Sequence, residues 1–145
     1  DYRAAFQISA QGMTVEKARL DVTSVNLANV HSTRGPDGTL FRPLRVTAQQ
    51  GTTVFAQSFG QALESAALQG PRIVGLEEVA GDPRLVYEPG HPQADEKGFV
   101  AYPAVDQVSE MVNLMTAVRA YEANVVAMNA TRTMAMKALE IGGNT

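Results

Sequence analysis

The chain carries a long heptad-patterned segment at each end, and each segment is apolar on more than one face. Near the C-terminus, one track in strict alternating steps of three and four contains Val108, Met111, Met115, Val118, Glu122, Val125, Asn129, Arg132, Met136 and Leu139. A second track runs beside it through Leu114, Ala117, Tyr121, Asn124, Met128, Thr131, Ala135 and Ala138. Such spacing predicts a helix of about 35 residues that packs against other helices.

The N-terminal segment has the same character. Phe6, Met13, Leu20 and Leu27 recur at every seventh position, and a separate track contains Ala4, Ile8, Gln11, Val15, Ala18, Val22 and Val25. We expect one helix from Tyr2 to Asn29, interrupted only by Gly12, which costs roughly 1 kcal/mol relative to alanine. A helix that is apolar on several sides must be buried on several sides. Because a chain of 145 residues offers few partners, we expect other chains to supply the missing ones.

Between the helices the apolar period changes to two. Leu44, Val46 and Ala48 alternate with polar residues, which is typical of a half-buried strand. Short strands are expected at 44–48, 52–56, 72–79, 84–87 and 98–102, separated by turn-forming Gly, Pro and Asp. Such strands would form a small sheet or a pair of hairpins. The stretch 57–70 is rich in Ala, Gln and Ser, and we interpret it as a flexible connection.

The last helix should begin after Pro103 with Asp106 as its N-cap, and end at Ile141–Gly143, where glycine suits the left-handed C′ position. The predicted fold is mainly α with a small β insertion, its two long terminal helices packing as a coiled coil. Residues 1–30 hold the first helix, 31–102 the β-rich central segment, and 103–145 the last helix.

Composition excludes several classes of function. The net charge is -3 and the basic residues are scattered, which argues against nucleic acid as a partner. There is no cysteine, so the chain has no disulfide and no thiolate metal site. We expect neither a membrane span nor a cleaved secretory signal, so that any export would follow another route.

The polar residues do not form a catalytic pattern. His31 and His91 stand alone in turn-rich stretches, without the several ligands that a metal site needs. The adjacent acidic pairs Glu77-Glu78 and Asp95-Glu96 point to opposite faces of a strand, which is poor geometry for acid–base work. We therefore expect no catalytic, cofactor-binding or metal site, and no enzyme activity.

Three strings resemble the terminal signatures of bacterial flagellar axial proteins. They are Ser24–Thr33 (SVNLANVHST), Tyr121–Asn124 (YEAN) and Ala138–Gly142 (ALEIG). Three others resemble the proximal-rod members of that family: Arg84–Pro92 (RLVYEPGHP), Gly98–Pro103 (GFVAYP) and Glu110–Asn113 (EMVN). The resemblance covers nearly the whole chain in order.

The resemblance implies a structural subunit of the bacterial flagellar proximal rod, which self-assembles through its terminal helices into a tubular axle that transmits torque. Its partners would be other copies of itself, other rod proteins, the membrane-anchored ring at the rod base and the type III export apparatus. It would lie in the periplasmic rod and need no cofactor. The near alternative is another axial protein, of the distal-rod or hook type.

Two other classes stay open. A membrane-surface protein should have helices with a Lys/Arg-rich polar face, which these helices lack. A small β-domain enzyme or ligand-binding module would leave both long helices unexplained.

The residues expected at the subunit interface combine the heptad positions with the signature asparagines. They are Phe6, Met13, Leu20, Asn26, Leu27, Asn29, Val108, Met111, Met115, Val118, Tyr121, Asn124, Val125 and Met128. The amides of Asn26 and Asn29 either cap the helix end or bond across a subunit contact. The methionines fill either a core or an interface, and Glu122, Asn129 and Arg132 are either solvated or fix the register.

Overall fold

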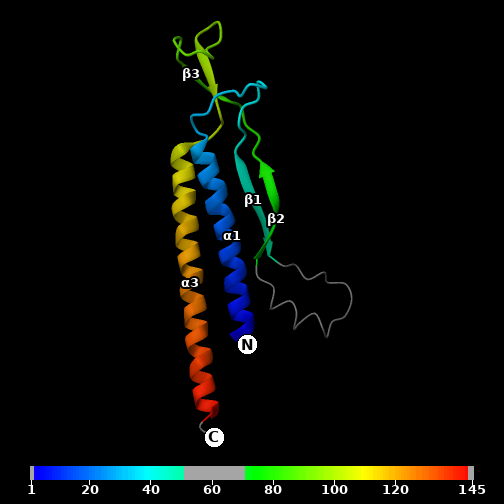
Figure 1. Cartoon of the computed structure of the whole chain (residues 1–145), viewed down its shortest axis with the longest axis vertical. Helices are drawn as coiled ribbons and strands as arrows, with labels where there is room; N and C mark the ends of the chain where they lie inside the picture. Colours follow the sequence, from blue (N-terminus) through cyan, green and yellow to red (C-terminus); the bar gives the residue numbers. More distant parts are fainter. Residues whose placement is uncertain (1, 51–70, 144–145) are drawn as a thin grey trace, which may run out of the picture.

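The computed structural model describes residues 2–50 and 71–143, so the expected strand at 52–56 and the whole connection at 57–70 lie outside the described residues. Two long helices, α1 (Tyr2–Ala28) and α3 (Gln107–Gly143), run antiparallel side by side (Figure 1). Between them come β1 (Leu44–Gln50), β2 (Pro71–Glu78), β3 (Arg84–Tyr87) and β4 (Phe99–Tyr102). The described chain is mainly helical with short antiparallel strands in its middle, as predicted.

β1 and β2 form an antiparallel ribbon. Its register runs from Leu44 opposite Glu78 to Gln50 opposite Pro71, with an irregularity after Thr47. The ribbon lies along α1, on the side away from α3 (Figure 1). α1 is therefore the middle layer of the molecule.

β3 and β4 form a hairpin at the end of the molecule opposite the chain termini (Figure 1). The Asp95 carboxylate accepts hydrogen bonds from the backbone N–H groups of Lys97 and Phe99, both at 2.9 Å. Gly98 has a φ of 84°, and a β-carbon there would lie 2.8 Å from the ring of Tyr87. The turn consequently requires glycine at position 98.

A small core forms where the hairpin meets the ends of the helices. Val30, Val100, Tyr102 and Val105 are all buried there, with Val100 only 1% exposed. Arg84 ties the hairpin to the end of α1, because its guanidinium donates to the Val30 carbonyl at 3.2 Å and lies 5.4 Å from the Tyr102 ring centroid. The hairpin is thus fixed to the helix pair by polar and apolar contacts together.

The predicted ends of both helices lie within one residue of the observed ends. α1 ends at Ala28, one residue before the expected Asn29. Asp106 caps α3, since its carboxylate accepts from the Val108 N–H at 3.1 Å and the Ser109 hydroxyl at 2.9 Å. These hydrogen bonds, that of Ser109 most strongly, lower the pKa of Asp106.

The expected left-handed cap at Gly142 is wrong. α3 continues through Gly142 and Gly143, and within residues 2–50 and 71–143 only Gly38 and Gly98 have positive φ. Glycine permits the left-handed conformation without requiring it, so it does not by itself end a helix.

Candidate assembly surface

The two heptad tracks of α3 face in different directions. On the second track, Ala117 is 3% exposed and Thr131 is 7% exposed, and this track faces α1. On the strict three–four track, Val108 is 71% exposed and Met115 is 57% exposed. The sequence predicted that both tracks pack against other helices. In the structure the second track packs against α1 of the same chain, and the strict three–four track is exposed to solvent.

α1 is covered on two sides by its own chain. It packs against α3 on one side and against both strands of the β1–β2 ribbon on the other. Ala4 and Val15, for which other chains were expected as partners, are buried within the chain. Val22 of the same track lines a cleft with Val46 of β1. The longer run of exposed apolar side chains is therefore on α3, although Phe6 and Val25 of α1 are also 44% and 43% exposed.

Gly12 and Asn124 mark a close approach between the helices. Gly12 is buried, and a β-carbon there would lie 2.8 Å from Asn124 Oδ1. The Asn124 side chain is held in place because its Nδ2 donates to the Ala120 carbonyl at 2.9 Å. From the sequence we counted only the cost of Gly12 to helix stability and missed its packing role. The sequence feature that could have indicated this packing role is a single glycine inside a long helix, without turn-forming residues beside it.

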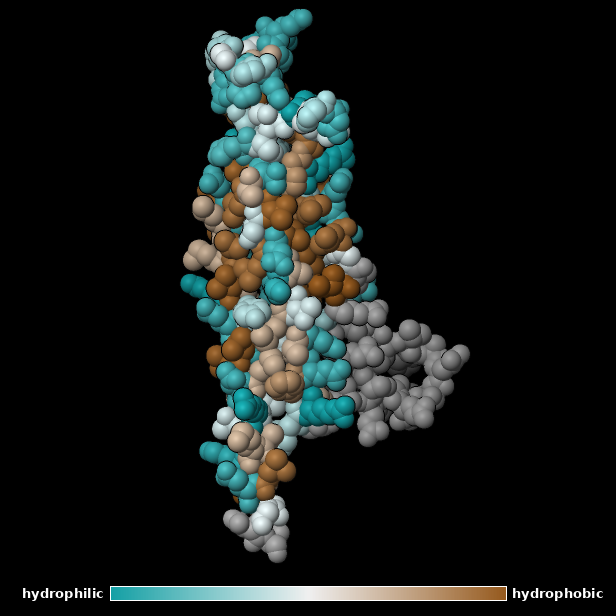
Figure 2. Space-filling model, in the orientation of Figure 1, coloured by the Kyte–Doolittle hydropathy of each residue, from teal (hydrophilic) through white to brown (hydrophobic). Residues whose placement is uncertain are grey.

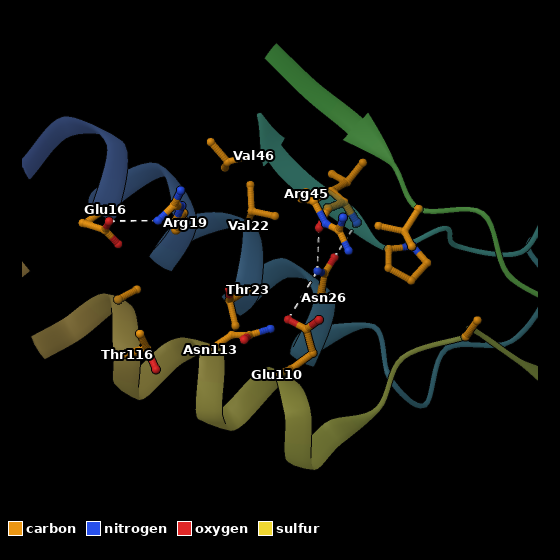
Figure 3. Close-up of a pocket in the computed structure, with 15 residues that line it drawn as sticks. Glu16, Arg19, Val22, Thr23, Asn26, Arg45, Val46, Glu110, Asn113 and Thr116 are labelled. Carbon is orange, nitrogen blue, oxygen red and sulfur yellow. Dashed lines mark hydrogen bonds and ion pairs between the residues drawn. The ribbon is translucent and has the colours of Figure 1, made fainter. Parts of the chain in front are cut away.

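Asn26 joins three elements (Figure 3). Its Nδ2 donates to the Leu44 carbonyl and its Oδ1 accepts from the Leu44 N–H, both at 2.9 Å. The same Nδ2 lies 3.5 Å from Oε2 of Glu110 on α3. Asn26 is 2% exposed, so its amide serves as a buried joint between α1, β1 and α3. This intrachain role differs from both roles that the sequence suggested.

Asn29 fits the capping interpretation better. Its Nδ2 donates to the Val25 carbonyl at 2.8 Å, one turn back in α1, and its backbone carbonyl accepts from the Ser32 hydroxyl at 2.8 Å. Both contacts are local and close the end of the helix.

A polar cleft of about 410 Å³ lies beside Asn26, between α1, β1 and the start of α3 (Figure 3). Glu16 and Arg19 on its wall form an ion pair at 3.0 Å. Across residues 2–50 and 71–143, no three His, Cys, Asp or Glu side chains are grouped so as to hold a metal ion. Within the same ranges, no helix has the length and apolar character needed to cross a membrane.

The predicted interface residues divide by burial. Phe6, Val108, Met111, Met115 and Val118 are exposed. Asn26 is buried, and the half-buried members are Met13, Leu20, Leu27, Asn29, Tyr121, Asn124, Val125 and Met128. Four of the five exposed residues lie on α3 at steps of three and four, which places them along one side of the helix.

We call these four residues, Val108, Met111, Met115 and Val118, the outer strip. They occupy the first third of α3, next to the hairpin. Apolar side chains gather over this end of the helix pair, whereas the hairpin head beyond it is mostly hydrophilic on the side that Figure 2 shows. An exposed apolar strip of this kind is typical of a protein–protein contact.

Comparison with known proteins agrees with a role in assembly. Residues 96–141 match the family model described as flagellar basal body rod FlgEFG protein C-terminal. The flagellar basal-body rod protein FlgC of Escherichia coli O157:H7 is 40% identical over 137 residues, which are 94% of this chain and 95% of that protein. The chain belongs to the FlgC family of flagellar basal-body rod proteins.

The family is matched across distant bacteria. FlgC of Bacillus subtilis strain 168 is 38% identical, with 95% of this chain and 96% of that protein covered. FlgC of Borreliella burgdorferi is 33% identical, with 95% of each chain covered. The chain is accordingly a structural subunit of the flagellar rod. The hook-type or distal-rod alternative is not favoured, because the FlgC relatives match nearly the whole chain, whereas the FlgEFG model matches residues 96–141 only.

Proposed function

We propose that this rod subunit polymerises through the outer strip of α3 and that its helix pair forms the core of a tubular, torque-transmitting axle. The observation that carries the proposal is the exposure of the strip, where Val108 is 71% and Met115 57% exposed although the opposite side of α3 is packed. Burying such side chains removes apolar surface from water and drives association.

We further propose that α1 and α3 pack as an antiparallel coiled coil. Gly12 lies against Asn124, and Asn26, fourteen residues further along α1, lies against Glu110, fourteen residues earlier in α3. The equal step corresponds to two heptads on each helix, which is the repeat of a coiled-coil seam. In this proposal residues 1–30 and 103–145 form the axial core, and residues 31–102 form the β-rich segment beside it.

The predicted interface residues take different roles in this proposal. Phe6 and the outer strip make direct contact with neighbouring subunits. The half-buried members lie at the border between the intrachain seam and that contact. Asn26 acts indirectly, because its bonds to Leu44 hold the β1–β2 ribbon against α1. A close-packed assembly of this kind transmits strain because packed interiors are barely compressible.

Membership of the family supports a set of partners and a location. We propose that the subunit contacts other copies of itself, other rod proteins and the membrane-anchored ring at the base. We also propose that the type III export apparatus delivers it, without a cleaved secretory signal, to the periplasmic part of the basal body.

Paired substitutions on the two sides of α3 test the proposal. Val118→Asp changes the outer strip, whereas Ala117→Asp places the same charge on the packed side, where position 117 is 3% exposed. Each variant is expressed in a motile bacterium whose own gene for the corresponding rod subunit is deleted. Swimming, the subunit content of isolated basal bodies and the urea stability of the purified protein are then measured.

We expect Val118→Asp to leave the unfolding free energy within about 0.5 kcal/mol of wild type, as for most surface changes, and to abolish swimming. Ala117→Asp should instead destabilise the monomer by several kcal/mol, because it buries an unpaired charge. Normal swimming with Val118→Asp would remove the outer strip from the interface. Failure of the wild-type chain to enter basal bodies would overturn the function itself.

A further inference from the structure

Two ridges of opposite charge run along the exposed side of α3. Arg119 and Lys137 form the basic ridge, Glu122 and Glu140 form the acidic ridge, and all four residues are exposed. Within each ridge the two charges are 18 residues apart, which is five whole turns at ~3.6 residues per turn. Each pair therefore lies on one line along the helix.

The ridges face away from α1. Ala117 faces α1, and at ~100° per residue Glu122 lies about 140° from it in one direction around the helix and Arg119 about 160° from it in the other. The acidic ridge is displaced by about 60° from the basic one, since a step of three residues turns the helix by about 300°. The two ridges thus run side by side on the outermost surface of the molecule's helix pair.

None of these charges has an ionic partner within the described chain. The ion pairs among residues 2–50 and 71–143 are Glu16–Arg19 and Arg42–Glu78. Arg119 and Glu122 have the three-residue spacing at which helical ion pairs form, yet they do not pair. The four charges are free to pair with another molecule.

Exposed apolar side chains flank both ridges. Met111, Val118 and Met136 lie beside the acidic ridge and are 49%, 39% and 54% exposed. Val112, Met134 and Ile141 lie beside the basic ridge and are 56%, 51% and 75% exposed. Contact between the two flanks would therefore bury apolar surface next to the ion pairs.

We propose that α3 of one copy packs parallel to α3 of a second copy, acidic ridge against basic ridge, displaced by three residues or ~4.5 Å. At this displacement Glu122 is level with Arg119 of the second copy, and Glu140 is level with Lys137 of the second copy. Both ion pairs form at once because the two ridges have the same 18-residue spacing. The inference rests on the proposed assembly through α3, and it names the neighbour and the register.

The contact is heterologous, so each copy keeps one ridge free for the next and the array continues. An antiparallel pair would match Arg119 with Glu140 and Glu122 with Lys137, and it would also satisfy the charges. That arrangement closes as a two-fold dimer and cannot extend. A rod subunit has to repeat in one direction, which selects the parallel arrangement.

Disulfide crosslinking distinguishes the two arrangements, because the chain has no cysteine of its own. Two single-cysteine copies are co-expressed in the deletion strain, Arg119→Cys with Glu122→Cys for the parallel register and Arg119→Cys with Glu140→Cys for the antiparallel one. After oxidation of isolated basal bodies we expect crosslinked dimers from the first combination only. Dimers from the second alone, or from neither, would overturn the proposal.

Charge reversal tests the same register without cysteine. We expect Glu122→Lys to reduce the subunit content of basal bodies about fivefold, because it replaces attraction by repulsion. The double variant Arg119→Glu with Glu122→Lys should recover the wild-type content, since the parallel register restores opposite charges at that level. In the antiparallel arrangement the double variant stays defective.

Glu96→Lys serves as the matched control, because it makes the same change in net charge in the exposed hairpin loop. It should leave the basal-body content unchanged. If Glu122→Lys left the basal-body content at the wild-type level, the proposed ion pairs would be wrong. The rod function would still stand in that case, provided that the unsubstituted chain assembles and restores swimming. Urea midpoints of the purified variants confirm that each remains folded.

Discussion

A β-carbon on Gly12 would lie 2.8 Å from Oδ1 of Asn124, so the two helices fit at this point only because position 12 lacks a side chain. The Asn124 amide cannot turn away without losing its hydrogen bond to Ala120. A residue that weakens α1 as an isolated helix therefore allows α1 and α3 to approach closely.

We expect Gly12→Ala to destabilise the purified protein by about 1 kcal/mol. Overpacking costs about 1–3 kcal/mol, and the higher helix propensity of alanine offsets about 1 kcal/mol of that cost. In an Asn124→Ala background the obstructing amide is gone, and the same substitution should stabilise by up to ~1 kcal/mol. Urea unfolding of the four proteins measures both values. Equal effects in the two backgrounds would show that the contact does not limit packing.

Asn26→Ala should cost about 2–3 kcal/mol of unfolding free energy, because it leaves the Leu44 N–H and carbonyl without their partner. Asn26→Asp should cost more at pH 7, since a carboxylate would face both the Leu44 carbonyl and the Glu110 carboxylate. That extra cost should shrink as the pH falls and the introduced carboxyl binds a proton. Asn29→Asp is the control, because the Asn29 amide makes only a local bond. A pH-independent difference between the two Asn26 variants would contradict this account.

The Asp106 cap predicts a pH dependence of α3. The hydrogen bonds from Ser109 and Val108 lower the pKa of the Asp106 carboxyl below its ordinary value of 3.8. A depressed pKa stabilises the folded state above the unfolded-state value, and the benefit is lost as the pH falls through the folded-state value. Asp106→Asn keeps a capping side chain that does not titrate.

We therefore expect the stability advantage of wild type over Asp106→Asn to be present at pH 6 and to vanish in strong acid. Urea unfolding of both proteins at a series of pH values isolates this residue, because all other acidic groups are shared. An advantage that persists unchanged to the lowest pH would contradict the assignment of Asp106 as an ionised cap.

The hairpin head should loosen when its anchor is removed. Arg84→Ala deletes both the hydrogen bond to Val30 and the contact with the Tyr102 ring, and we expect a loss of about 1–2 kcal/mol. Leu85→Ala, one residue along β3 and 63% exposed, should change stability by less than about 0.5 kcal/mol. Amide hydrogen exchange of residues 84–102 reports the loosening locally. Equal effects of the two substitutions would show that Arg84 is no anchor.

Local patterns predicted the elements of this fold well. The heptad spacing identified both long helices, and β3 spans the predicted residues 84–87, because periodicity and turn residues are local properties. Periodicity also indicated that α3 has two apolar faces. It could not tell which face meets α1, because that depends on the positions of the other elements.

The roles of single polar residues were harder to predict. Asn26 stands in a helix-end context that favours capping, but its partner Leu44 is 18 residues away and is brought close only by the tertiary fold. Gly12 likewise acquires its role from Asn124 on the other helix. Such contacts depend on which elements pack together, and a propensity or spacing rule does not contain that information.

The pairing of α1 with α3 joins the two ends of the chain. Gly12 and Asn124 are 112 residues apart, and closing a loop of that length costs roughly 4 kcal/mol in chain entropy. Contacts between such distant residues form slowly. A chain that passes end-first through a narrow channel cannot form this helix pair until nearly all of it has emerged. An incomplete chain therefore lacks the contact between α1 and α3 on which the finished fold depends.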